Sequence, residues 1–292
     1  DLPGELTITT APTGGADDSF TYQWEQSTDG ETFEEIEGAT SDSYQSGALV
    51  KDCYFRLRTT SVKGCGERYS NVVKVSVYAD LETDVKGEDK LCYMTEGDIV
   101  VSATGQGEQY TYQWQYSEDN ISFADISGET ADRYTTEPKP AGVYYYQCVV
   151  TPTNGCMSKT TASYAVEVYE DLTPGVISEN QTICYNTIPA PLIQTTPPTG
   201  ADGEYNYQWE QSTDGVSFEE ISGATSTEYA PKALKSTTLY RLRVINACKS
   251  DYTNVVTVTV RPDITPAEIS EVSEPICYNT APGELTVTTV HT

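Results

Sequence analysis

Histidine is almost missing from this sequence, since the 292 residues contain only His291. A serine or cysteine nucleophile needs a neighbouring base, and an imidazole is the usual one. Basic residues are also few: 17 lysines and arginines stand against 44 aspartates and glutamates, which gives a formal net charge of −27. A polyanion of this density repels the phosphates of nucleic acids. We therefore expect neither an enzyme nor a nucleic-acid-binding protein.

Long apolar runs are missing as well. No segment approaches the roughly 18 consecutive apolar residues of a membrane helix, so we expect a chain that is not embedded in a membrane. No signal peptide is visible, and the sequence opens at Asp1 in the middle of a repeating pattern. We interpret it as a piece of a longer protein.

The sequence does contain one phrase written three times. YQWEQSTDG occurs at 22–30 and again at 207–215, and a diverged copy, YQWQYSEDN, stands at 112–120. The single tryptophans of the copies recur after 90 and 95 residues (114 − 24 and 209 − 114). Such internal repetition indicates tandem domains of one kind. The three tryptophans are Trp24, Trp114 and Trp209.

Each copy has the pattern of β-structure. FTYQWEQS at 20–27 and YFRLRTT at 54–60 alternate outward and inward residues, and proline and glycine interrupt the chain about every ten residues. Short strands in units of about 90 residues favour an immunoglobulin-like sandwich. We predict an all-β, elongated array of such domains, in which the three tryptophans fill the space between the sheets as core residues.

Domain boundaries are expected after each closing strand, where VYADLETD (77–84), VYEDLTPG (168–175) and VRPDITPA (260–267) share an Asp-Leu or Asp-Ile step. The predicted domains are an N-terminally incomplete repeat 1 (1–79), repeat 2 (80–170), repeat 3 (171–261) and the start of a fourth (262–292). The opening DLPGELTITT matches the end of ICYNTAPGELTVTT in the fourth unit. Two interpretations stay open: the array is cut there, or the C-terminal strand of one copy completes the N-terminal unit of the next.

Four of the eight cysteines recur in matched contexts. Cys92 and Cys184 stand in Leu/Ile-Cys-Tyr, whereas Cys156 and Cys248 follow glycine or alanine. Within each repeat the two positions are 64 residues apart (156 − 92 and 248 − 184). We therefore predict one disulfide inside each repeat, Cys92–Cys156 and Cys184–Cys248. Such bonds would stabilise thin cores and indicate an oxidising, exported location.

The other four cysteines fall outside this scheme. Cys65 would pair with a cysteine ahead of Asp1, and Cys148 replaces an inward leucine and is expected to be a buried thiol. No partner is predicted for Cys53 or Cys277. None of these spacings resembles a zinc site.

No cofactor is predicted, and calcium is the one metal left open. Aspartates gather in the expected loops, and Ca²⁺ binds clusters of oxygen ligands. Solvated turns explain the same residues without a metal, and we favour that interpretation. The aspartates are Asp17, Asp18, Asp29, Asp119, Asp202 and Asp214.

The frame ICYNT…YQWEQSTDG…GAT…YRLRV…TNVVTVTV resembles the tandem immunoglobulin-like repeats of very large secreted surface proteins of Bacteroidota, including gliding-motility adhesins. The resemblance implies an extracellular or cell-surface location and a structural or adhesive role in an array or fibre, without catalysis. Neighbouring repeats of the same parent chain or fibre would be the partners. The alternative is a module that binds carbohydrate or a host surface protein through exposed tyrosines, such as those at 144–146.

Overall fold

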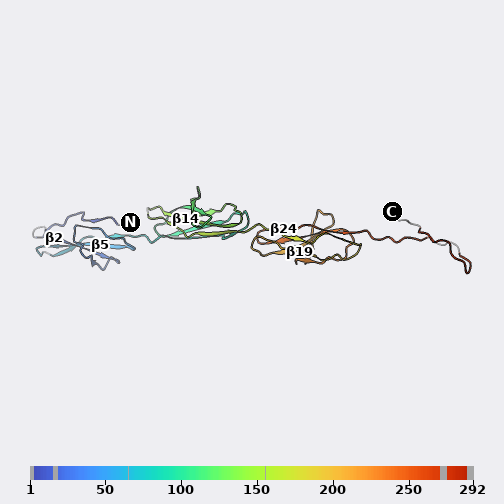
Figure 1. Cartoon of the computed structure of the whole chain (residues 1–292). Coiled ribbons are helices and arrows are strands. Elements are labelled where there is room, and N and C mark those ends of the chain that lie inside the picture. Colours follow the sequence, from blue (N-terminus) through green and yellow to red (C-terminus); the bar gives the residue numbers. More distant parts are fainter. Residues whose placement is uncertain (1–2, 16–18, 65, 155, 270–274, 288–292) are drawn as a thin grey trace. The chain divides into compact units, whose positions relative to one another are not determined.

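The computed structural model describes residues 3–15, 19–64, 66–154, 156–269 and 275–287. Every regular element in these residues is a β-strand, so the all-β prediction is confirmed. The chain divides into two compact units: residues 1–89, 96–137 and 143–166, and residues 90–95, 138–142 and 167–292. Repeat 1 lies in the first unit and repeat 3 in the second, whereas repeat 2 contributes to both. Figure 1 colours the chain by residue number, from blue at the N-terminus to red at the C-terminus. Five residues named above lie outside the described residues: Asp1, Asp17, Asp18, Cys65 and His291.

Repeat 3 shows the arrangement in full. One sheet has the order β17-β19-β22, and the other has the order β18-β25-β23-β20-β21, with β24 also paired to β23. Both sheets contribute side chains to one core, which makes the repeat a sandwich with the strand order of an immunoglobulin-like domain. The strands are β17 (Val176–Ile177), β18 (Gln181–Ile183), β19 (Leu192–Thr196), β20 (Asn206–Ser212), β21 (Glu219–Glu220), β22 (Glu228–Tyr229), β23 (Thr238–Ile245), β24 (Ser250–Tyr252) and β25 (Val256–Val260).

Repeat 2 repeats this order. Its sheets are β13-β10-β8 and β12-β11-β14-β16-β9, with β15 also paired to β14. The strands are β8 (Glu82–Gly87), β9 (Lys90–Leu91), β10 (Asp98–Thr104), β11 (Tyr110–Ser117), β12 (Ala124–Asp125), β13 (Arg133–Thr135), β14 (Gly142–Pro152), β15 (Lys159–Thr160) and β16 (Tyr164–Val168).

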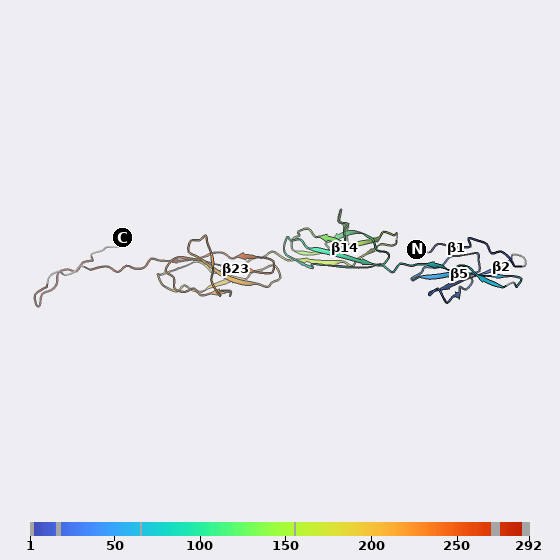
Figure 2. The ribbon, with the colours of Figure 1, turned by 180° about the vertical axis from the view of Figure 1, so that it is seen from behind.

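Repeat 1 has a more open core. Its strands β1 and β4 pair with each other, and the second sheet has the order β3-β2-β5-β6, with β7 also paired to β5. Figure 2 labels β1, β2 and β5 of this repeat. The described part of repeat 1 holds no counterpart of β17 or β18. A cavity of about 680 Å³ reaches Trp24, Phe55 and Leu57 there. The strands are β1 (Leu6–Thr7), β2 (Phe20–Ser27), β3 (Glu34–Glu35), β4 (Ser43–Tyr44), β5 (Cys53–Ser61), β6 (Glu67–Tyr69) and β7 (Val73–Val75).

The three tryptophans occupy the same place in their sandwiches. Trp24 is 5% exposed, and Trp114 and Trp209 are 0% exposed. A large aromatic ring contributes on the order of 3 kcal/mol when it is buried, so each repeat has a core of its own. A tyrosine ring lies beside each indole, at centroid distances of 6.0, 5.9 and 5.9 Å for Tyr44, Tyr134 and Tyr229.

The Asp-Leu step at the start of repeats 2 and 3 anchors each repeat. The carboxylates of Asp80 and Asp171 each accept the N–H of the next residue at 2.9 Å. That residue is buried, since Leu81 is 1% and Leu172 5% exposed. In repeat 3 the carbonyl of Asp171 lies against Gly200, where a Cβ would come within 2.1 Å of the carbonyl oxygen. Only glycine fits that contact.

One expectation about exposure is wrong. Tyr144 and Tyr146 on β14 are 8% and 1% exposed, because alternate residues of that strand face the core. Cys148 continues the same alternation and is buried, as predicted. Residues 144–146 therefore do not form an exposed tyrosine surface.

Candidate functional site: the inter-repeat disulfide and the charged sheet face

Cys92 of repeat 2 is bonded to Cys248 of repeat 3, with the two Cα atoms 5.5 Å apart. Both residues belong to the second compact unit. Cys156 and Cys184 carry free thiols. The predicted pairs Cys92–Cys156 and Cys184–Cys248 are therefore wrong, although the residues of the bond come from the predicted set.

The direction of the strands in repeat 3 explains the error. Cys184 directly follows β18, whose last residue, Ile183, pairs with the last residue of β25, Val260. Cys248 lies in the turn that joins β23 to β24, beyond Ile245. Thr238 at the other end of β23 pairs with Val258. The length of β23, roughly 23 Å for seven steps of about 3.3 Å, therefore separates Cys184 from Cys248, whereas a disulfide requires Cα atoms within about 7 Å.

The bonded cysteines both lie where repeat 2 continues into repeat 3. Leu91, just before Cys92, pairs with Val168 at the end of β16. Lys249, just after Cys248, forms an ion pair of 2.7 Å with Asp171, which directly precedes the buried Leu172 of repeat 3. The disulfide thus joins two ends of sandwiches: the end of repeat 2 at which β16 finishes, and the end of repeat 3 at which the chain enters that repeat.

Two kinds of turn carry these cysteines. We call the first the strand-end turn: Thr95 donates from its N–H (3.2 Å) and its Oγ1 (2.8 Å) to the carbonyl oxygen of Cys92. Residues 184–187 and 277–280 repeat both bonds. In the three turns, taken in chain order, the third residue has a positive φ of 55°, 57° and 63°. We call the second the hairpin turn, in which an asparagine carboxamide oxygen accepts the cysteine N–H: Asn246 to Cys248 at 2.9 Å and Asn154 to Cys156 at 3.1 Å.

The free thiols of the described residues differ in exposure. Cys53 and Cys148 are buried, whereas Cys184 and Cys277 are exposed. Burial raises the pKa of the Cys148 thiol to about 11. Both buried thiols are core residues, and Cys148 carries little thiolate at neutral pH.

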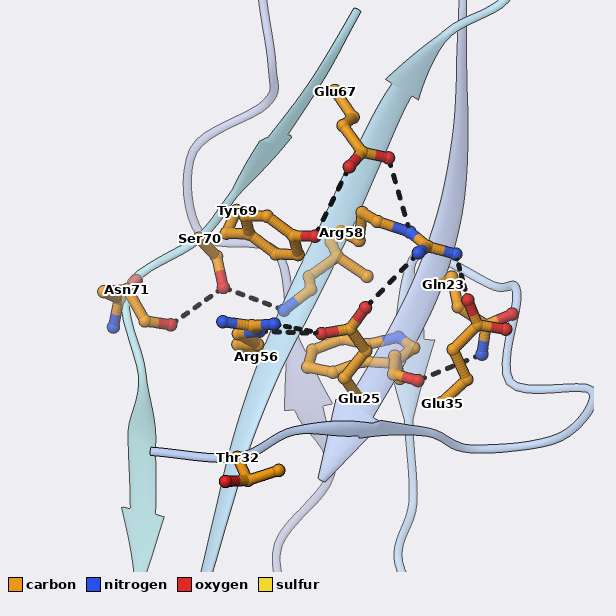
Figure 3. A network of polar contacts seen from close by, with 12 residues as sticks. Gln23, Glu25, Thr32, Glu35, Arg56, Arg58, Glu67, Tyr69, Ser70 and Asn71 are labelled. Atoms are coloured by element: carbon orange, nitrogen blue, oxygen red, sulfur yellow. Dashed lines mark hydrogen bonds and ion pairs between the residues drawn. The ribbon is translucent and has the colours of Figure 1, made fainter. Parts of the chain in front are cut away.

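A charged network covers one face of the β2–β5 pair in repeat 1 (Figure 3). Glu25 is 3% exposed, accepts hydrogen bonds from Arg56 at 2.7 Å and forms an ion pair with Arg58 at 3.6 Å. Arg58 also contacts the carboxylates of Glu35 and Glu67. A buried carboxylate with two guanidinium partners is strongly destabilised when one partner is lost, so this network stabilises the pairing of the two strands.

The same network recurs in repeat 3. Glu210 is 3% exposed and pairs with Arg241 at 2.6 Å and with Arg243 at 3.7 Å. The guanidinium of Arg241 also stacks between the rings of Phe218 and Tyr252, 4.1 and 3.7 Å from their centroids.

Repeat 2 replaces the network with neutral groups. Gln115 and Gln147 occupy the paired positions, and the carboxamide of Gln147 donates to Gln115 at 2.7 Å. Sequence analysis missed these networks, although a glutamate after each tryptophan of repeats 1 and 3 and an Arg-x-Arg in the partner strand indicated them.

The loop aspartates of the repeated phrase bind their own turns. The carboxylate of Asp29 accepts the N–H groups of Glu31 and Thr32, both at 2.8 Å, and the hydroxyl of Ser27. These donors, the Thr32 N–H first, lower the pKa of Asp29 to about 2. Asp119 and Asp214 make the same contacts in their repeats. Across the described part of the chain, no three histidine, cysteine, aspartate or glutamate side chains form a group suited to a metal ion.

The described residues contain no helix that could span a membrane. No match is found among the curated proteins. The solved structures similar to this chain include Drosophila OTK extracellular domains 3–5, with 12% identity over 89% of this chain and 98% of that chain and a TM-score of 0.37. They also include fibronectin(III)-like modules of Clostridium thermocellum CbhA, with 12% identity over 61% of this chain and 95% of that chain and a TM-score of 0.29. A third is the Ig1–2 module of Drosophila DLAR, with 12% identity over 61% of this chain and 98% of that chain and a TM-score of 0.24. At these TM-scores the likeness carries no argument, and the fold assignment rests on the strand order.

A family model described as a domain of unknown function, DUF8696, matches the sequence three times, over residues 1–79, 82–170 and 173–262. Each match covers one tryptophan and one of the three repeats. The chain therefore belongs to the DUF8696 family.

Proposed function

We propose that this chain is a non-catalytic structural and adhesive segment of a large extracellular surface protein or fibre, and that neighbouring repeats of the parent protein are its main partners. The observation that carries the proposal is the Cys92–Cys248 bond between consecutive repeats. A bond inside a domain stabilises that domain alone. A bond between domains limits how far the array extends under load.

The mechanical consequence follows from the sequence separation of 156 residues between the bonded cysteines. A force applied to the two ends of the chain passes through the disulfide, and the residues between Cys92 and Cys248 bear no tension. The largest parts of repeats 2 and 3 are therefore shielded from unfolding by stretching.

An exported location agrees with several features. Disulfides persist in oxidising compartments, and a net charge of −27 keeps an exposed array soluble and resists self-association. The resemblance of the repeated frame to secreted surface proteins of Bacteroidota supports a place at the cell surface.

A non-catalytic role agrees with the kinds of residue that the three repeats share. The residues common to the repeats include core tryptophans and turn aspartates that already bind their own backbone. The single histidine of the sequence is His291, near its end. The repeated positions therefore serve the fold and offer no nucleophile with a base.

The alternative is a module that binds glycans or host surface proteins through exposed tyrosines. The burial of Tyr144 and Tyr146 removes its main candidates, and two exposed rings, Tyr69 and Tyr252, are stacked on arginines of their own repeats. We therefore favour the structural role.

Pulling on single molecules tests the proposal. The chain is held at its two ends and stretched under oxidising and then reducing conditions. Reduction is expected to lengthen the fully extended chain by on the order of 500 Å, since 156 residues at roughly 3.3–3.6 Å each are released. Cys92→Ser should behave like the reduced chain, and Cys184→Ser, which removes a free thiol, like the oxidised one. Equal extension of oxidised and reduced chains would contradict the proposal.

A further inference from the structure

Two free cysteines occupy the same structural positions as the two bonded ones. Cys184 lies in the strand-end turn of repeat 3, as Cys92 does in repeat 2. Cys156 lies in the hairpin turn of repeat 2, as Cys248 does in repeat 3. Among the described residues, the Cys92–Cys248 bond is a completed link between these two kinds of position.

We infer that the strand-end cysteine of each repeat is a covalent docking point for the hairpin-turn cysteine of the repeat that follows it, so that Cys184 binds the next repeat of the array. The partner is a further repeat of this family with Asn-x-Cys in its hairpin turn. Cys184 is exposed, as a thiol that awaits such a partner must be.

The linker after repeat 3 has the same features as the linker between repeats 2 and 3. Three residues lie between Val168 and Leu172, and three lie between Val260 and Ile264. Asp263 accepts the N–H of Ile264 at 2.9 Å, as Asp171 does for Leu172. Ile264 is 87% exposed, whereas Leu172, 5% exposed, is inserted into the core of its repeat. Ile264 is therefore the anchor that a complete following repeat would bury.

Successive bonds of this kind would overlap along the chain. Cys184 lies between Cys92 and Cys248 in the sequence, so the loop closed from Cys184 begins inside the loop closed from Cys92. Each repeat would then be bonded to the repeat before it and to the repeat after it. The array would be cross-linked continuously. A repeat that lost one of its two disulfides would still be bonded to a neighbour through the other.

The bond forms by thiol–disulfide exchange with a small disulfide such as oxidised glutathione. The Cys184 thiolate attacks one glutathione sulfur and releases one reduced glutathione. The hairpin-turn thiolate then attacks the Cys184 sulfur of this mixed disulfide and releases the second. Two thiols lose two protons and two electrons, and one oxidised glutathione becomes two reduced ones.

Lengthening the chain by one repeat tests the inference. A copy of residues 170–261 is inserted between Arg261 and Pro262, which keeps the length of both joints. The protein is oxidised in glutathione buffer, alkylated and digested without reduction, and its linked peptides are identified by mass spectrometry. The expected links are Cys92–Cys248 and Cys184 to the inserted copy of Cys248, with loss of alkylation at Cys184.

A matched variant carries Cys248→Ser in the inserted copy only. It should restore alkylation of Cys184 and leave the Cys92–Cys248 link unchanged. A second chain carries a copy of residues 79–169 at the same place, so that the copy of Cys156 presents the hairpin turn. Protection of each insert from trypsin shows that it is folded.

Cys184 that stays alkylated beside a folded insert overturns the inference, and so does the absence of the link from both lengthened chains. The result is independent of the pulling experiment, since the bond can form whether or not the array bears load.

Discussion

The indole Nε1 of Trp209 donates a hydrogen bond of 2.9 Å to the carbonyl oxygen of Ser226. The same bond joins Trp24 to Ser41 and Trp114 to Ala131, each time to a residue 17 positions on. The bond satisfies the one polar atom of a buried ring and fixes the loop that follows β21. The recurring tryptophan therefore both fills the core and holds a loop.

Trp209→Phe should lower the stability of repeat 3 by about 2–3 kcal/mol, because it leaves a cavity and an unpaired carbonyl group. Hydrogen exchange of the β23 amides is the measurement, and these amides should exchange faster. Val216→Ala is the control, since Val216 is 85% exposed in the same repeat. Unchanged protection in Trp209→Phe would show that the indole does not support the core.

Glu210→Ala should destabilise repeat 3 by roughly 3 kcal/mol, because it leaves Arg241 and Arg243 without their shared buried partner. The double variant Glu210→Gln/Arg241→Gln copies the Gln115–Gln147 pair of repeat 2 and should cost less than the single change. Denaturation followed by circular dichroism compares them. A double variant less stable than Glu210→Ala would mean that the ion pair itself is the main stabilising contact.

Acid should destabilise the chain between about pH 4 and pH 2 through the turn aspartates. The pKa of Asp29 is lowered from 3.8 to about 2, and that of Asp119 likewise. Because the unfolded carboxyls have the higher pKa, protons bind the unfolded chain first. The stabilisation is complete above about pH 4 and is lost as the pH falls through the folded value.

The melting temperature at pH 7, 4 and 2.5 measures this effect. Asp29→Asn/Asp119→Asn keeps an oxygen acceptor without a titrating group, so its melting temperature should fall less over the acid range. If the melting temperatures of the native chain and the variant fell equally with pH, other carboxyls would be responsible for the acid sensitivity.

The sandwich and its core were predictable from sequence because they rest on local periodicity. Alternation in FTYQWEQS places Trp24 on the inner face, and the repeat of the phrase multiplies that signal. Alternate residues of a strand face the same side, so counting back from the inward Cys148 in steps of two would have placed Tyr144 in the core.

The disulfide was not predictable in this way. The separation of 64 residues within a repeat is set by the length of the domain and says nothing of which end of the sandwich each cysteine occupies. Strand direction decides that: Cys184 follows the end of β18 and Cys248 lies beyond β23, at the opposite end. Only the pairing of strands shows that consecutive repeats bring the two positions together.

Thiol reactivity should divide the free cysteines of the native chain. Iodoacetamide at pH 8 is expected to label the exposed Cys184 and Cys277 quickly. Cys148 should react only after denaturation, because burial raises its pKa to about 11. Mass spectrometry of tryptic peptides gives the extent of labelling, and rapid labelling of Cys148 would contradict the buried position.

The central claim is that the cysteines connect consecutive repeats. Digestion of the oxidised, alkylated chain without reduction, followed by mass spectrometry of the linked peptides, tests it most directly. The account predicts a Cys92–Cys248 peptide together with alkylated Cys156 and Cys184. A map with Cys92–Cys156 and Cys184–Cys248 peptides instead would contradict it.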